Sequence, residues 1–167
     1  MAVVMGETAS LYDKKFVVQT QSYGPEARGG ASKSELVIGD DEIDYPKVLE
    51  PDTFIAMSRA AYLEYIDGLK EDGILIIDED LVKIEGDLPK GVKLYSIPAT
   101  RIADEEVGTK QATNVVMIGA FTAITGMLSM KGLKKRIEER WPRFAETNLK
   151  ALELGMKAGK AALEAQQ

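Results

Sequence analysis

The stretch Thr53–Asp78, which reads TFIAMSRAAYLEYIDGLKEDGILIID, decides the fold that the sequence predicts. Its first residues, Thr53–Met57, predict a strand, and Ser58 supplies a side-chain oxygen that can cap the helix that follows. Its last residues before the aspartate, Gly73–Ile77, form a continuous apolar run, as expected of a strand buried on both faces of a parallel sheet. Strand, helix and strand in succession predict an α/β architecture.

The chain on either side of this stretch extends the same prediction. Further strands are expected at Phe16–Thr20, Glu35–Gly39 and Val92–Ile97. The loop between the first two is too irregular for a crossover helix, so they are not expected to form a simple βαβ unit. Helices are expected at Lys131–Trp141 and Phe144–Leu163, which give the protein a helical C-terminal region after its α/β sheet.

A long apolar segment, Ala112–Met130, separates the sheet from these last helices and contains no charged residue. Its length approaches that of a membrane span, but its threonine, serine, asparagine and glycine residues lower the hydropathy and favour a buried helix. Gly119, Ala123 and Gly126 share one helical face, where another backbone can approach closely. We expect this face to lie in the core or in a subunit interface, and the interface alternative includes a homodimer of the isolated chain.

Composition excludes several classes of function. The 167 residues correspond to one domain, and a net charge of −6 disfavours broad contacts with nucleic acid. The chain contains no cysteine and no histidine. It therefore cannot supply the usual ligands of an iron–sulfur cluster or zinc centre, or a Ser-His-Asp or Cys-His catalytic set. The first residues lack a basic segment typical of a secretory signal, so we expect a cytoplasmic protein without a membrane partner.

The loop within Gln19–Ser34 is the strongest candidate for a functional contact. It combines glycines that permit positive φ and a proline that fixes one φ with charged and hydroxyl side chains suited to a polar partner. The alternative is an ordinary turn with solvated charges. The candidate residues are Ser22, Tyr23, Gly24, Pro25, Glu26, Arg28, Gly29 and Gly30.

Three other places carry chemistry, each with a structural alternative. Asp78–Asp80 follows a buried strand, where it could contact magnesium or a sugar hydroxyl or simply form a turn or helix cap. Arg101 could meet an anion or form surface ion pairs with its acidic neighbours. Asn114 precedes an apolar helix and is either a ligand or interface residue or a helix cap. No catalytic residue, metal site or phosphate-binding glycine motif can be assigned.

The run Thr20–Ser32, TQSYGPEARGGAS, resembles the signature loop of the gamma subunit of 2-oxoacid:ferredoxin oxidoreductases. The resemblance continues in the expected order over nearly the whole chain. Its further elements are Tyr45-Pro46, Pro51-Asp52, Ala56-Met57-Ser58, Gly73–Asp78, Asn114–Gly119, Asn148, Ala151 and Gly155. The Tyr-Gly-Pro-Glu-Ala-Arg-Gly-Gly form of the loop is most similar to that of 2-oxoglutarate enzymes.

This resemblance implies a Rossmann-like domain, with a mostly parallel sheet flanked by helices, that works inside a multisubunit enzyme. Such an enzyme oxidatively decarboxylates a 2-oxoacid to an acyl-CoA and CO2 and passes the electrons to ferredoxin. Thiamine diphosphate with Mg is expected in the alpha and beta subunits and iron–sulfur clusters in a ferredoxin-like subunit, so this chain would bind no cofactor alone. Its loop is expected to face the thiamine-bearing subunits, near the place where the acyl group meets CoA.

The sequence departs from the family at its start. Members usually begin with a strand and a turn similar to Gly-Phe-Gly-Gly-Gln-Gly, and neither is found here. Either residues 1–167 start within the domain, after this strand and glycine-rich loop, or the protein lacks both. We expect residues 1–167 to form a single gamma-subunit domain of the pyruvate/ketoisovalerate oxidoreductase type. Two rival expectations are a free-standing nucleotide-binding α/β module and a non-catalytic scaffold subunit.

Overall fold

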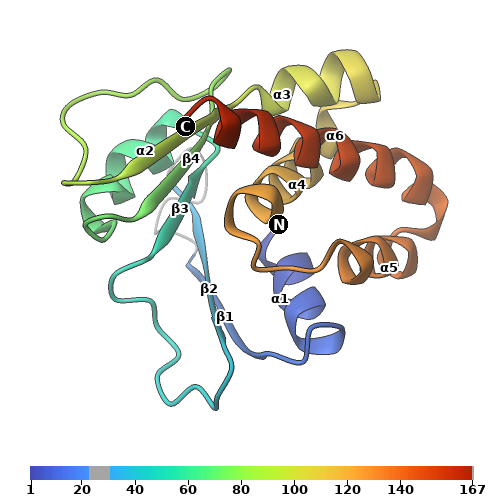
Figure 1. The fold of residues 1–167 in the computed structure, drawn as a ribbon, viewed down its shortest axis with the longest axis horizontal. Helices are drawn as coiled ribbons and strands as arrows, with labels where there is room; N and C mark the ends of the chain where they lie inside the picture. The colour runs from blue at the N-terminus through green and yellow to red at the C-terminus, as the bar shows by residue number, and fades with distance from the viewer. Residues whose placement is uncertain (23–30, 167) are drawn as a thin grey trace.

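The computed structural model describes residues 1–22 and 31–166, and within these ranges the strands form two sheets. The parallel sheet has the order β3 (Thr53–Ala56), β4 (Ile74–Asp78), β5 (Lys93–Ile97), with Ile55 opposite Ile76 and Ile76 opposite Tyr95. The arrangement confirms the predicted α/β fold with a parallel sheet (Figure 1).

Helices cover the parallel sheet on both faces, as the apolar run of β4 predicts. Leu75 and Ile77 of β4 join a buried cluster with Tyr62 of helix α2 (Arg59–Tyr65). Ile76 points to the other face and belongs to the main core. The predicted cap of α2 is confirmed, because the Ser58 hydroxyl accepts a hydrogen bond from the Ala61 N–H at 3.2 Å. A 3₁₀ turn, η1 (Ile66–Gly68), continues α2.

The second sheet is the antiparallel pair of β1 (Phe16–Ser22) and β2 (Lys33–Gly39), called here the β1–β2 pair. Its register runs from Phe16 opposite Gly39 to Ser22 opposite Lys33. Helix α1 (Ala2–Leu11) packs against it so closely that a Cβ on Gly6 would lie 3.0 Å from Leu36 Cδ1. The prediction that these strands form no βαβ unit is confirmed, because they are paired neighbours that run in opposite directions.

The described part of the chain after β5 forms helices and no strand, as predicted (Figure 1). Its main helix, α4, passes through the middle of the core and packs along α6. The elements in chain order are α3 (Ala99–Arg101), a π-helix η2 (Ile102–Val107), η3 (Lys110–Ala112), α4 (Thr113–Thr125), α5 (Met130–Arg140), η4 (Pro142–Phe144) and α6 (Ala145–Glu164). No helix in the described ranges is both long enough and apolar enough to cross a membrane.

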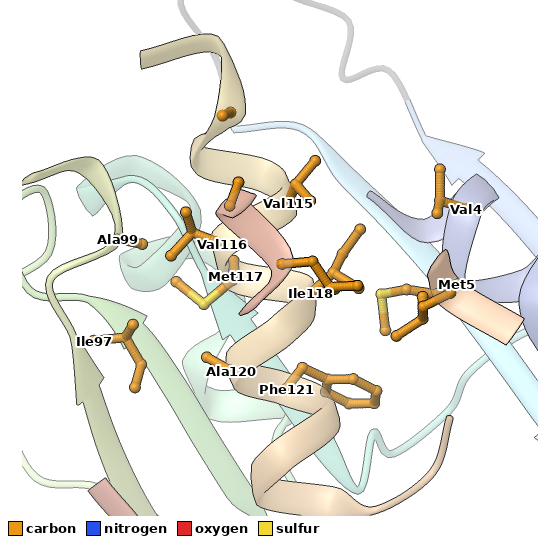
Figure 2. Packing of buried hydrophobic residues seen from close by; sticks show 14 of the residues in the cluster. Val4, Met5, Ile97, Ala99, Val115, Val116, Met117, Ile118, Ala120 and Phe121 are labelled. Carbon is orange, nitrogen blue, oxygen red and sulfur yellow. The ribbon is translucent and has the colours of Figure 1, made fainter. Parts of the chain in front are cut away.

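Helix α4 is buried almost all round, which explains its lack of charge. Figure 2 shows Ile118 and Phe121 on the side of α4 that faces Met5 of α1, and Met117 on the side of Ile97 of β5. All of these side chains are at most 5% exposed. The helix thus joins α1 and the parallel sheet into one core.

The predicted close approach of another backbone to α4 is confirmed for Gly119, where a Cβ would lie 2.7 Å from the backbone nitrogen of Met156 in α6. Gly155 and Gly159 of α6 complete this glycine contact from the other side. The prediction was wrong for Gly126. That residue has φ +66° and ends α4, and no described atom lies within 4 Å of a Cβ placed there. Gly126 has the sequence spacing of the packed face. Its left-handed conformation ends the helix, however, so the residue does not lie on that face.

Candidate functional site

Most of the candidate loop lies outside the described residues. Tyr23, Gly24, Pro25, Glu26, Arg28, Gly29 and Gly30 belong to the range 23–30, and of Ser22 only its backbone place at the end of β1 is described. The structure therefore defines where the loop begins and ends, at Ser22 and Ala31. A functional role for the loop stays a prediction.

Side chains across the β1–β2 pair tie the two strands together beside the loop. The Thr20 hydroxyl donates to Glu35 Oε2 at 2.9 Å, and Gln19 Nε2 donates to Ser34 Oγ at 3.2 Å. Lys33 Nζ lies 2.6 Å from Glu35 Oε1. This hydrogen bond from Lys33, aided by that of Thr20, lowers the pKa of the Glu35 carboxyl, against a smaller opposing effect of burial. Glu35 is therefore an ionised acceptor that joins both strands.

A cleft of about 1030 Å³ is lined by residues of both sheets. Its wall includes Lys33–Ile38 of β2 and Thr53–Ile55 of β3, and Met5 and Phe121 contribute apolar surface from α1 and α4. Gln21 and Ser32, which flank the loop, also line it. The cleft therefore reaches the place where the loop leaves β1 and returns to β2. Its volume is in the upper range of ligand sites, and its mixed apolar and polar lining suits binding and orientation.

Asn114 lines this cleft from the first turn of α4. It also lines a second cavity of about 320 Å³, together with Trp141 and Phe144 of the α5–η4 region. The helix-cap interpretation of Asn114 is wrong, because Ala112 occupies the N-cap position of α4. The Asn114 side chain is exposed and stands where the two cavities meet. The structure thus brings Asn114 to the same cleft as the residues that flank the loop.

Asp78 and its neighbours form hydrogen bonds and an ion pair within the protein, in line with the turn or cap that was the alternative to a ligand site. The Asp78 carboxylate is fully buried and accepts hydrogen bonds from the Thr100 hydroxyl at 2.6 Å and from the Asp80 N–H at 3.3 Å. Arg101 forms the expected surface ion pair, with Nη2 2.7 Å from Glu79 Oε1. These contacts join the ends of β4 and β5, and they lie apart from the lining of both cavities.

Sequence reasoning missed one residue beside the loop. Tyr65 is the last residue of α2, and its hydroxyl donates to the Ala31 carbonyl oxygen at 3.2 Å. Its side chain is half-buried and lines the large cleft. The contact spans 34 positions in the chain. No local sequence pattern encodes such a contact. The available signal was the tyrosine itself, because a tyrosine hydroxyl that is buried usually has a hydrogen-bond partner.

Comparison with known proteins gives consistent matches over most of the chain. The protein 2-oxoglutarate synthase subunit KorC of Methanocaldococcus jannaschii is 47% identical over 159 residues, which cover 95% of this chain and 85% of that protein. Pyruvate synthase subunit PorC of the same organism is 34% identical over 151 residues, with 87% of this chain and 82% of that protein covered.

A solved structure agrees with the fold. The gamma subunit of a keto/oxoacid ferredoxin oxidoreductase from Geobacter sulfurreducens matches with a TM-score of 0.83 and 39% identity, over 96% of this chain and 89% of that one. Residues 1–158 match the sequence profile of the family described as pyruvate ferredoxin/flavodoxin oxidoreductase. With these matches in sequence and in fold, the chain belongs to the pyruvate ferredoxin/flavodoxin oxidoreductase family.

Proposed function

We propose that this chain is the gamma subunit of a 2-oxoacid:ferredoxin oxidoreductase that converts 2-oxoglutarate, CoA and oxidised ferredoxin to succinyl-CoA, CO2 and reduced ferredoxin. The observation that carries the choice of substrate is the contrast within one organism, where identity is 47% to the 2-oxoglutarate synthase subunit and 34% to the pyruvate synthase subunit. The Tyr-Gly-Pro-Glu-Ala-Arg-Gly-Gly form of the loop supports the same choice.

The cofactors of the proposed enzyme belong to its other subunits. The chain has no cysteine or histidine, so it offers none of the usual ligands of an iron–sulfur cluster. We place thiamine diphosphate with Mg in the alpha and beta subunits and the clusters in a ferredoxin-like subunit, and we place the complex in the cytoplasm. In this arrangement the gamma chain contributes binding and orientation, which are the tasks that the cleft and the loop beside it can perform.

Residues 1–167 form one gamma-subunit domain in this proposal. Both sheets and the helices α1, α5 and α6 contribute to the core that runs through α4. The loop of the β1–β2 pair is then the part of this domain that meets the thiamine-bearing subunits, beside the site where the acyl group meets CoA.

The purified chain is expected to show no oxidoreductase activity alone and to co-purify with larger subunits that carry thiamine diphosphate and iron–sulfur clusters. The physical reason is that the chain supplies no redox centre of its own. Affinity capture from the native organism, followed by mass spectrometry and a ferredoxin-reduction assay, tests this. Turnover of a 2-oxoacid by the isolated chain would contradict the proposal, and capture of the chain with no such subunits would favour a free-standing module.

Replacing Arg28 with alanine is expected to lower the activity of the assembled complex about tenfold, the size of effect that follows from one lost charge-assisted hydrogen bond. The midpoint of thermal unfolding should change little, since a single loop side chain contributes little to a packed core. Arg59→Ala is the matched control, because Arg59 forms an exposed ion pair with Glu85 and lines neither cavity. Equal losses of activity and of stability in Arg28→Ala would return the loop to a structural role.

A further inference from the structure

A single side chain from α2 reaches the end of the candidate loop. Tyr65 Oη donates to the carbonyl oxygen of Ala31, the first described residue after the range 23–30, at 3.2 Å. Tyr65 is the last residue of α2, and its side chain is half-buried in the wall of the large cleft. A backbone carbonyl accepts this bond, so the contact fixes the position of the main chain at the place where the loop returns to β2.

The same aromatic ring holds a second contact with β2. Lys33 Nζ lies 5.3 Å from the centroid of the Tyr65 ring, within the range of a cation–π interaction. The Lys33 ammonium group also pairs with Glu35, which accepts the hydrogen bond from Thr20 of β1. A continuous series of contacts therefore runs from α2 through Tyr65, Lys33 and Glu35 to both strands of the β1–β2 pair.

These contacts matter because of how the two sheets are joined. In the described part of the chain, the β1–β2 pair and the parallel sheet share no ladder of backbone hydrogen bonds. Helix α2 and the 3₁₀ turn η1 are anchored to the parallel sheet by Tyr62 and Ile66, which lie in one buried cluster with Leu75. Side chains must therefore hold the loop end of the β1–β2 pair in its orientation toward the parallel sheet. Tyr65 is such a side chain, because it connects α2 to the β1–β2 pair.

We infer that Tyr65 is a positioning residue for the reaction: it fixes the loop end of the β1–β2 pair against α2 so that the loop meets its partner in the productive orientation. This inference rests on the proposed function of the loop. Small displacements of groups that orient reactants reduce rates strongly, whereas the net stability of the domain depends little on one half-buried hydroxyl.

The experiment compares Tyr65→Phe with Tyr62→Phe in the assembled complex. Tyr62 is the matched control, because it lies on the same helix and its hydroxyl also donates to a backbone carbonyl, that of Glu85, at 3.0 Å. That contact is with the segment between β4 and β5 and not with the β1–β2 pair. Both variants lose one phenol hydrogen bond and are expected to unfold at temperatures within about 4 °C of the parent. Tyr65→Phe alone is expected to lower kcat/KM for CoA about fivefold at saturating 2-oxoglutarate.

A kcat/KM that is unchanged in Tyr65→Phe, or equally lowered in both variants, would overturn the inference. Lys33→Met keeps the aliphatic stem and removes the charge, and it is expected to lower kcat/KM for CoA about twofold. This variant tests the inference if Tyr65→Phe does not assemble into the complex.

A failure of the proposed function can be distinguished from a failure of this inference. If Arg28→Ala leaves activity intact, the proposed loop function fails, and if Arg28→Ala lowers activity while Tyr65→Phe and Lys33→Met do not, the positioning role alone is wrong.

Discussion

Replacing Gly155 with valine is expected to lower the free energy of unfolding by about 3 kcal/mol or more, the upper range for overpacking of a rigid contact. A Cβ at this position would lie 2.7 Å from the carbonyl carbon and 2.9 Å from the Cα of Val116 in α4. Because these are backbone atoms, no rotamer change can relieve the overlap. Helices α4 and α6 must move apart, which loosens the core around Leu152 and Met117.

Thermal unfolding followed by circular dichroism measures this loss, and a decrease of 3 kcal/mol corresponds to roughly 6–12 °C in a domain of this size. Gly155→Ala should destabilise in the same direction although alanine is the better helix former by about 1 kcal/mol. Gly68→Ala is the matched control, since no described atom lies within 4 Å of a Cβ there. A Gly155→Val protein as stable as the parent would mean that the two helices are not in direct backbone contact.

Replacing Asp78 with alanine is expected to cost about 2–3 kcal/mol, because it leaves partly buried donors of Thr100 and Asp80 without their acceptor. The carboxylate is fully buried and accepts from the Thr100 hydroxyl and from backbone N–H groups of Asp80 and Thr100. These bonds connect the end of β4 to the first turn of α3. The same unfolding measurement tests the change.

Asp78→Asn should recover part of this loss, since the amide oxygen still accepts while the NH2 group meets the Thr100 hydroxyl. Asp87→Ala serves as the surface control, because Asp87 lies in the exposed loop between β4 and β5. A cost for Asp78→Ala no larger than that of the control would show that the Thr100 interaction contributes no net stability.

Local patterns predicted the elements of this fold well, because the physics that forms them is local. The Ser58 hydroxyl lies three positions from the N–H that it caps, and the apolar run at Gly73–Ile77 directly reports a strand covered on both faces. The π-helix at Ile102–Val107 was not predicted, since its hydrogen-bond pattern has no distinctive side-chain periodicity.

The site was predicted less completely, because its contacts join distant parts of the chain. Tyr65 and Ala31 are 34 positions apart, and Asp78 and Thr100 are 22 apart. The helix predicted after Ser58 includes Tyr65, but no local pattern could state which group its hydroxyl meets. The loop itself was selected from its composition and its family resemblance, and its role remains a prediction that Arg28→Ala tests.

The position of Met1 affects how the protein can be handled in the laboratory. Met1 lines both the large cleft and the smaller cavity beside Trp141, so in a protein expressed as residues 1–167 a purification tag placed before Met1 would start inside the wall that the two share. Such a tag would compete with any ligand or subunit for that space. A tag after α6 avoids this wall, although it sits next to Gln166, whose side chain donates to the Leu94 carbonyl at β5. Capture experiments should therefore use the C-terminus, with a spacer long enough to leave that contact undisturbed.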